Sequence, residues 1–325
     1  MIRFFGDNRP LVLLFLPLII LVFHFSYHLS NAAYGPLDID FGFWGNVTIK
    51  QGNSIVLYEI IAASWVLFNA ILLNYTFNSG EFNDKNTYLP SLIYIVLCAT
   101  CMNFYAFNGL HLTNTALILT IYQFIGLTQH QDGSKQIFNG GIFLGLAATV
   151  YPPLIILFPF GIIMYLGFRP FLIREFWFYL LGYALPFIYL ISKVYLMGNE
   201  WPKFSVGWNE FILNFHLKNA INTAVFVVVF LVGIIGAWQK LSMGGNRLKK
   251  ELQLVNTLSL GLLFSFLFCI FLLAPPMNLE LFAIPFSLLF TYPFLSKRLT
   301  FASSLLFYLF LLFGLLKFVL LNQLS

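Results

Sequence analysis

The first long apolar stretch of the chain, residues 10–28, reads PLVLLFLPLIILVFHFSYH and contains no Asp, Glu, Lys or Arg. A helix needs about twenty consecutive apolar residues to cross the hydrocarbon core of a bilayer. Further apolar runs follow near residues 54–74, 89–105, 113–128, 137–151, 153–167, 176–196, 219–239, 254–274, 278–295 and 300–321. The sequence therefore predicts an all-α membrane protein, a single polytopic domain over residues 1–325 with about eleven transmembrane helices.

The amino-acid composition excludes an ordinary soluble protein. Of the 325 residues, 60% are apolar and only 9% are charged, whereas soluble domains have about 25% charged residues. Most of the surface must therefore face lipid. The basic residues behind the net charge of +5 stand singly or in small clusters beside apolar runs, so we expect no nucleic-acid partner. The cysteines lie within apolar runs and are expected to be buried thiols.

The distribution of basic residues predicts the orientation in the membrane. With the N-terminus in the cytoplasm, twelve of the 17 basic residues fall inside and five outside. The inner residues are Arg3, Arg9, Lys85, Lys135, Arg169, Arg174, Lys240, Arg247, Lys249, Lys250, Lys297 and Arg298, and the outer ones are Lys50, Lys193, Lys203, Lys218 and Lys317. Basic residues are enriched in cytoplasmic loops. We therefore expect a protein of the bacterial inner membrane with a cytoplasmic N-terminus and an outer C-terminus.

The two longest loops, near residues 29–53 and 197–218, both fall on the outer side and are rich in aromatic residues. Tyr34, Phe41, Phe43 and Trp44 lie in the first loop, and Trp201, Phe204, Trp208, Phe211 and Phe215 lie in the second. Aromatic side chains favour the headgroup level of a membrane. The pattern therefore predicts short interfacial helices that lie flat on the outer leaflet, in contact with membrane lipid.

Two carboxylates in the first outer loop are the candidate catalytic residues. Asp38 and Asp40 stand in an otherwise apolar, glycine-containing segment, PLDIDFGFWG, at residues 36–45. One of them could act as a general base and the other as a ligand for a metal ion or a hydroxyl group. Residues two apart point the same way only when the loop is extended. The alternative is a solvated loop whose charges simply face water.

The proline pairs mark two candidate phosphate-binding helix ends. Pro152–Pro153 and Pro275–Pro276 both fall on the outer side, and an apolar run follows each pair. A helix N-terminus presents free N–H groups and partial positive charge, which suit a phosphate. Tyr151 directly precedes the first pair and is a candidate substrate-binding residue. Two ordinary tight turns are the alternative interpretation.

Four further charged residues are candidate substrate contacts. Glu59 and Glu280 lie near the outer ends of their spans, where acidic groups are costly and often functional. Lys193 and Lys203 could hold a phosphate, although a lysine near a span end can also snorkel to the interface. No metal site is predicted, because nothing in the sequence shows that the histidines converge. The sequence does not identify a cofactor.

The segment that leads into the first proline pair, residues 138–153, reads FNGGIFLGLAATVYPP. It resembles the Gly-Leu-Ala helix and proline break of GT-C glycosyltransferases. The resemblance implies a GT-C-like core and an enzyme that uses a polyprenyl-phosphate-linked sugar at the outer face, with a catalytic acid in the first outer loop. Asp38 and Asp40 occupy the matching loop here. The large outer domain and the Asp-Glu pair of those enzymes have no counterpart in this chain.

A second resemblance covers most of the chain. It is carried by Arg3-Phe4-Phe5, which precedes Asn8 and Pro10, and by residues 168–177, FRPFLIREFW, followed by Leu181-Gly182 and Pro186. These motifs resemble a family of Bacteroidota inner-membrane proteins of about this length. The resemblance implies a compartment and a fold but no reaction.

Two functions stay open from the sequence. The first is GT-C-like handling of a polyprenyl-phosphate-linked sugar at the periplasmic face, with Asp38 or Asp40 as the base. The second is a non-catalytic membrane subunit of an envelope assembly or secretion machine, whose outer loops would contact membrane-protein partners. A transporter is less well supported, because the chain shows no clear inverted repeat and no set of charged residues in mid-span.

Overall fold

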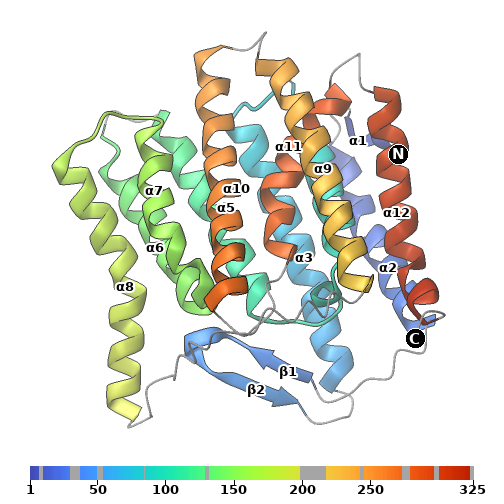
Figure 1. Ribbon diagram of the computed structural model, residues 1–325, viewed down its shortest axis with the longest axis horizontal. Helices are drawn as coiled ribbons and strands as arrows, with labels where there is room; N and C mark the ends of the chain where they lie inside the picture. Colours follow the sequence, from blue (N-terminus) through green and yellow to red (C-terminus); the bar gives the residue numbers. More distant parts are fainter. Residues whose placement is uncertain are drawn as a thin grey trace.

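Helices make up nearly all of the chain that the structure describes. The computed structural model describes residues 1–6, 10–29, 37–49, 54–83, 85–128, 132–197, 217–241, 245–272, 279–295 and 300–322. The helices lie side by side in one bundle, and a two-stranded hairpin lies across one end of it (Figure 1). With η for a 3-10 helix, the helical elements are α1 (Ile2–Gly6), η1 (Pro10–Phe15), α2 (Leu16–Leu29), η2 (Gly42–Trp44), α3 (Ser54–Ser79), α4 (Leu89–Ala99), η3 (Met102–Tyr105), α5 (Gly109–Ile125), η4 (Gly126–Thr128), α6 (Ser134–Val150), η5 (Pro152–Ile156), α7 (Leu157–Leu166), α8 (Ile173–Met197), α9 (Leu217–Leu241), α10 (Asn246–Leu272), η6 (Leu279–Phe282), α11 (Ala283–Leu295) and α12 (Thr300–Asn322).

Five helical segments are long and apolar enough to cross a membrane, which confirms the predicted multi-pass, all-α character. They are Pro10–His28, Val56–Ser79, Gly109–Thr128, Ile173–Met197 and Asn246–Cys269. Shorter apolar helical segments run over Leu89–Ala99, Pro152–Leu166, Phe226–Leu241, Leu279–Leu295 and Ser303–Lys317. Each of the eleven expected spans coincides with a described helix, but a count of eleven membrane crossings stays a prediction.

The core of the bundle is built around α4 and α11. Every residue of α4 is buried, and in α11 the run from Ala283 to Pro293 is buried throughout. A helix that is apolar on all sides needs neighbours on all sides. Helices α3 and α12 pack against α4, while α9 packs against α11. The two short helices therefore form the centre that the longer helices surround.

Large apolar side chains cover the outside of the bundle. Leu14, Ile173, Tyr195 and Phe301 each expose 70% or more of their surface. Soluble monomers rarely expose contiguous apolar patches of more than a few hundred square ångströms. Similar side chains on α2, α3, α8, α9 and α12 are also exposed, so the outer surface of the bundle is suited to lipid.

Helices α6 and α8 form the most extensive helix pairing among the described residues. Gly145 on α6 faces the backbone of Tyr183, and Gly182 on α8 faces the backbone of Phe138, so closely that a Cβ at either glycine would collide with a carbonyl oxygen. Small residues allow membrane helices to approach in this way. The glycines in residues 138–153, which carry the resemblance to GT-C enzymes, therefore have a packing role in this fold.

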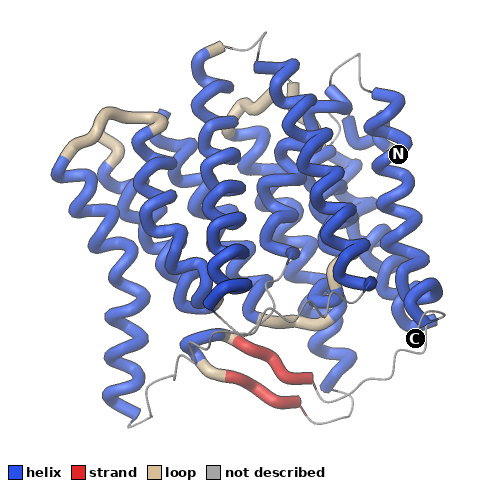
Figure 2. The backbone as a smooth tube through the Cα atoms, in the orientation of Figure 1, coloured by secondary structure: helices blue, strands red, loops and turns tan. Residues whose placement is uncertain are grey.

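A β-hairpin occupies the described part of the first long loop, so the interfacial helix predicted over residues 29–53 is wrong for residues 37–49. Strands β1 (Leu37–Asp40) and β2 (Asn46–Ile49) pair antiparallel, with Leu37 opposite Ile49 and Asp40 opposite Asn46 (Figure 2). The alternation of apolar and polar residues in LDID has the period of a strand. Gly42 has a φ of +61°, and a Cβ there would collide with the backbone of Val150, so this turn requires glycine. Most of the second loop, residues 198–216, lies outside the described residues.

Charged side chains gather at the end of the bundle opposite the hairpin. Arg247, near the start of α10, pairs with Glu81 after α3 and with Glu251 one turn further along α10. Lys250 donates to the carbonyl oxygen of Phe168 at 3.0 Å, and Arg169 pairs with Glu175 at 3.4 Å. Many of the basic residues assigned to the cytoplasm therefore lie at one end of the molecule.

Candidate functional site

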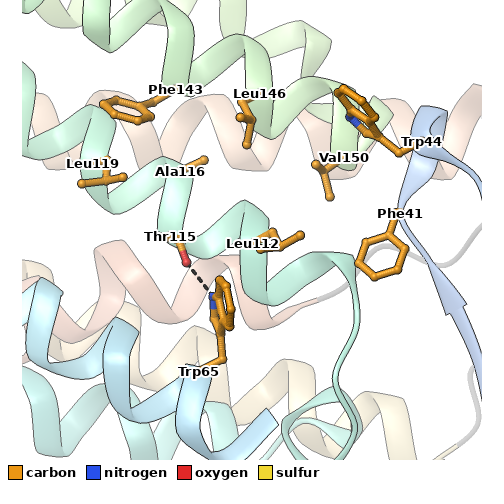
Figure 3. Close-up of a pocket in the computed structure, with 10 residues that line it drawn as sticks. All are labelled: Phe41, Trp44, Trp65, Leu112, Thr115, Ala116, Leu119, Phe143, Leu146 and Val150. Atoms are coloured by element: carbon orange, nitrogen blue, oxygen red, sulfur yellow. Dashed lines mark hydrogen bonds between the residues drawn. The ribbon is translucent and has the colours of Figure 1, made fainter. Parts of the chain in front are cut away.

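An apolar pocket lies between α3, α5 and α6 at the hairpin end of the bundle. Its volume is about 450 Å³, which is within the usual range for small-molecule sites, about 300–1,000 Å³. Ten residues line it, namely Phe41, Trp44, Trp65, Leu112, Thr115, Ala116, Leu119, Phe143, Leu146 and Val150 (Figure 3). Nearly all of these side chains are apolar, so the pocket suits a hydrocarbon chain.

The hairpin supplies one wall of this pocket through the residues at its turn. Trp44 donates its indole N–H to the hydroxyl of Thr149 on α6 at 3.2 Å. Phe41 and Trp44 both face the pocket (Figure 3). Because the hairpin is fastened to α6 at this point, the wall is positioned by a hydrogen bond as well as by apolar contact.

A polar cluster supports the α3–α5 side of the pocket. The Thr115 hydroxyl accepts from the Trp65 indole at 2.9 Å (Figure 3). It donates to the Asn69 side-chain oxygen at 2.7 Å. The Asn69 amide donates to the carbonyl oxygen of His111 at 3.0 Å. Buried polar groups are stable when their hydrogen bonds are satisfied. The cluster therefore fixes the Trp65 ring at the pocket.

Lys193 contacts Trp44, one of the pocket-lining residues, where the hairpin meets α8. Its Nζ donates to the carbonyl oxygen of Trp44 at 3.3 Å and lies 5.2 Å from the centre of the Trp44 ring. An ammonium group has three N–H donors, so the contact with one carbonyl leaves donors for an anionic group. Lys193 was predicted as a phosphate contact, and the structure places it against Trp44, a residue of the pocket lining, although Lys193 itself does not line the pocket. Lys203 lies outside the described residues.

The two candidate acids lie in strand β1, close to the pocket. Asp40 is exposed, and its Oδ1 accepts from the backbone N–H of Gly42 at 2.7 Å. The Asn46 amide, with its nitrogen facing this carboxylate, donates to the same oxygen at 2.8 Å. Asp40 therefore stabilises the hairpin turn. Asp38 lies opposite Thr48 in the pairing of β1 with β2. Its side chain is not among the described parts of the structure.

The other predicted substrate contacts lie in separate surroundings. Glu59 is buried and pairs with His28, with 3.1 Å between carboxylate and ring nitrogen. Tyr151 forms the break between α6 and η5 and directly follows Val150, which lines the pocket. Glu280 is fully buried at the start of η6, where its Oε1 accepts from the Asn114 amide at 3.3 Å. The fold therefore brings Lys193 and the hairpin together but surrounds Glu59 and Glu280 with partners of their own.

Lys317 is a buried residue that the sequence interpretation treated only as an outer basic residue. Its Nζ donates to the carbonyl oxygens of Ala99 and Cys101, at 2.9 and 3.2 Å, and lies 4.9 Å from the centre of the Tyr105 ring. It is the one charged residue in the described part of α12. A lone charge in an apolar run is itself a functional signal, so this residue could have been found from the sequence.

A second, polar pocket of about 570 Å³ lies between α3, α5 and α6 at the opposite end. Asp132 is part of its lining, and it accepts from the Ser134 hydroxyl and backbone N–H at 2.7 and 3.0 Å. These hydrogen bonds, with the positive charges of Arg174 and Arg169, lower the pKa of Asp132 below its usual value. Lys135 also lines this pocket, which makes it a control for Lys193.

Among the described residues, no group of three or more histidine, cysteine or acidic side chains could hold a metal ion. His24 and His111 are buried, whereas His28 pairs with Glu59. His130 and His216 lie outside the described residues.

No protein-family model, curated protein or solved structure matches this chain. The resemblances to GT-C glycosyltransferases and to a Bacteroidota membrane-protein family therefore stay predictions.

Proposed function

We propose that this protein binds a phosphate-bearing lipid of the polyprenyl-phosphate class at the hairpin end of the bundle. The observation that carries the proposal is an apolar pocket with an ammonium group, that of Lys193, against one of its lining residues, Trp44. In this proposal the part of the chain nearest the headgroup occupies the pocket, and the phosphate lies near Lys193.

The pocket favours an apolar chain for two physical reasons. Transfer of apolar surface out of water is favourable by about 25 cal/mol per Å². The tryptophan and phenylalanine rings that line the pocket provide broad, rigid contact surfaces. A polar ligand in the same place would lose hydrogen bonds to water without gaining new ones.

The ammonium group favours a phosphate over a neutral headgroup. Lys193 sits near apolar surface, where a charge interaction is stronger than in water. The Trp44 carbonyl holds Nζ beside the pocket at 3.3 Å, so less side-chain entropy is lost when the phosphate binds. A lysine placed in this way supplies a point charge for a phosphate oxygen.

Glycosyl transfer is the catalytic form of this proposal, with Asp38 or Asp40 as the base. Asp40 is exposed and adjoins Phe41, a residue of the pocket lining. Its test is Asp40→Asn, which keeps a hydrogen-bond acceptor but removes the charge. A catalytic base accounts for about 10²–10⁴-fold in rate. Normal complementation of a deletion strain by Asp40→Asn, by Asp38→Asn and by the double variant would exclude this form.

A non-catalytic lipid-binding subunit is the second candidate. It is favoured by the contacts of Asp40, because Gly42 and Asn46 both donate to the carboxylate. In this form the protein presents or stores the lipid for a membrane-protein partner. Purification with that partner, together with full function of both Asn variants, is the expected result for this candidate.

We propose an inner-membrane location with the hairpin outside and the N-terminus in the cytoplasm, because the charged end of the bundle lies opposite the hairpin. Gly245 lies at the charged end and Val47 in the hairpin, and both are exposed. A cysteine at residue 47 should react with an impermeant thiol reagent in intact cells, and one at residue 245 should not. The native cysteines are buried, so they add little background. The reverse pattern would overturn this orientation.

The lipid proposal is tested with the purified protein and a photoreactive polyprenyl phosphate, alongside the matching polyprenol without phosphate. A hydrogen bond to a charged group contributes about 1.5–3 kcal/mol. Lys193→Gln should therefore weaken labelling by the phosphate about 10- to 100-fold and leave labelling by the alcohol unchanged. Leu112→Trp, which fills the pocket, should weaken both.

Lys135→Gln is the matched control, because Lys135 lines the polar pocket at the other end. It should leave both labelling reactions unchanged. Unchanged labelling in Lys193→Gln and Leu112→Trp would refute the proposed site. An equal loss of labelling in Lys193→Gln and Lys135→Gln would mean that labelling depends on the net charge of the protein and not on a site at Lys193.

A further inference from the structure

Glu280 is a fully buried carboxyl group within the helix bundle. It lies in η6, at the start of the apolar segment Leu279–Leu295, and its relative exposure is 0%. A carboxylate removed from water is costly unless it is paired or neutralised by a proton. Its partners therefore decide which charge state it adopts.

The hydrogen bonding of Glu280 is incomplete. Its Oε1 accepts from the amide of Asn114 at 3.3 Å, whereas its Oε2 has no hydrogen-bond partner in the described part of the chain. The side-chain oxygen of Asn114 also has none among the described residues, although Asn114 is fully buried. A buried carboxylate oxygen without a donor is a place where a proton is stabilised.

Lys317 supplies positive charge nearby and has partners of its own. Glu280 interacts with it electrostatically. The ammonium group is hydrogen-bonded to two carbonyl oxygens at the end of α4 and lies over the Tyr105 ring. Lys317 therefore remains stabilised when Glu280 loses its negative charge, so the two groups need not change charge together.

We propose that Glu280 is a proton-exchange site inside the membrane-embedded bundle, with Asn114 as its fixed hydrogen-bond donor and Lys317 as its counter-charge. In the exchange, Oε2 of the carboxylate accepts a proton from a hydronium ion, whose O–H bond breaks and leaves water. In the reverse step the Oε2–H bond breaks and water takes up the proton. The site differs from the proposed lipid pocket, because neither Glu280 nor Asn114 lines that pocket.

The surroundings favour a proton over a metal ion. A bound metal cation would lie close to the positive charge of Lys317 in a medium of low dielectric constant, where like charges repel strongly. The described residues also hold no cluster of three or more ligands suited to a metal. A proton removes the charge of the carboxylate and adds no second cation.

The ionisable groups that face Glu280 come from three elements. Tyr94 and Cys98 on α4, Cys101 after α4 and Lys317 on α12 interact with it electrostatically. Helix α5 presents Asn114, with His111 one turn earlier. The sides of η6 next to α9 and α10 are apolar, with Phe226 and Phe266 in the small pocket beside Phe282. Lys317 is therefore the group with a standing charge that most affects Glu280.

The test is modification of the full-length protein by dicyclohexylcarbodiimide, an apolar reagent that reacts with protonated carboxyl groups. The peptide that carries Glu280 should be labelled at low pH, and labelling should fall as the pH rises. Glu280→Gln should remove this labelling, whereas Glu59→Gln, at a second buried carboxyl group, should leave it unchanged. Asn114→Leu removes a donor to the carboxylate and should move the midpoint up by about one to two pH units.

An infrared measurement keeps the proposal testable if the reagent does not reach the site. The carbonyl band of a protonated carboxyl group should disappear as the pH rises in the wild type and should be absent throughout in Glu280→Gln. If sodium ions protect Glu280 from the reagent, the site binds a metal cation in place of a proton. This result would overturn the proposal. Labelling and a carboxyl band that do not change with pH would also overturn it. Neither readout depends on lipid binding.

Discussion

Replacement of Gly145 by alanine tests how closely α6 and α8 approach each other. A Cβ at residue 145 would collide with the backbone carbonyl oxygen of Tyr183, and backbone yields less readily than the end of a side chain. Overpacking costs about 1–3 kcal/mol, and alanine recovers about 1 kcal/mol over glycine through its higher helix propensity. At the upper end of that range, Gly145→Ala should lower the free energy of unfolding by about 2 kcal/mol.

Gly126 provides the matched control. A Cβ there would contact only the Gln136 side chain, at 3.6 Å, and its φ of −57° suits alanine. Gly126→Ala should therefore be neutral or stabilising by about 0.4–1 kcal/mol. The two variants add the same methyl group at two helical positions, Gly145 on α6 and Gly126 at the end of α5, and only the first faces α8, so a difference between them reports the contact with α8.

The assay is thermal unfolding in detergent, followed with a dye that becomes fluorescent on reaction with thiols. Cys98, Cys101 and Cys269 are all buried, so the dye reports loss of the fold. A loss of about 2 kcal/mol should lower Tm by roughly 4–8 °C. Equal Tm values for Gly145→Ala and Gly126→Ala would refute a close approach of α6 and α8 at this glycine.

Three further predictions concern individual charged residues. Asp40→Ala should loosen the hairpin turn and speed proteolysis there, whereas Asp40→Asn should not; equal cleavage of the two would contradict the turn-stabilising role. Hydrogen bonds from Ser134 hold the pKa of Asp132 below its usual 3.8. The ionised carboxylate therefore stabilises the fold at pH values above 3.8. This stabilisation is lost as the pH falls through the lowered pKa. The Tm difference between wild type and Asp132→Asn should therefore shrink in acid. A Tm difference that stays constant with pH would contradict the stabilising role of the ionised Asp132. Lys317→Met should cost about 1–3 kcal/mol, because two buried carbonyl groups lose their donor, while Lys249→Met at an exposed position should change Tm little; similar Tm values for the two variants would rule out that role.

The location of the helices was predictable from the sequence, because lipid requires each crossing segment to be apolar and internally hydrogen-bonded. The expected run near 10–28 appears as η1 and α2, and the break at Pro152 appears where α6 gives way to η5. The separation of the charged end from the hairpin end also follows from the positions of basic residues along the chain.

The hairpin replaces the predicted interfacial helix because the alternation of apolar and polar residues, and not the aromatic content, fits its backbone conformation. The segment LDID already has the period of a strand, and the two glycines at the turn permit positive φ, with values of +61° for Gly42 and +104° for Gly45. What the sequence did not reveal is that this hairpin is fastened to α6 through Trp44 and Thr149.

The convergence of the candidate sites was decided only by the tertiary structure. Glu280 and Asn114 are 166 residues apart in sequence, and Lys317 lies 218 residues from Ala99, whose carbonyl it contacts. Apolar patterning specifies that a helix is buried, but lipid-like surfaces on many helices are nearly equivalent and do not specify which two helices meet. Close contacts such as that of Gly145 with α8, and the few buried polar pairs, distinguish one arrangement from the others, because only in that arrangement are the small residues opposed and the polar groups paired.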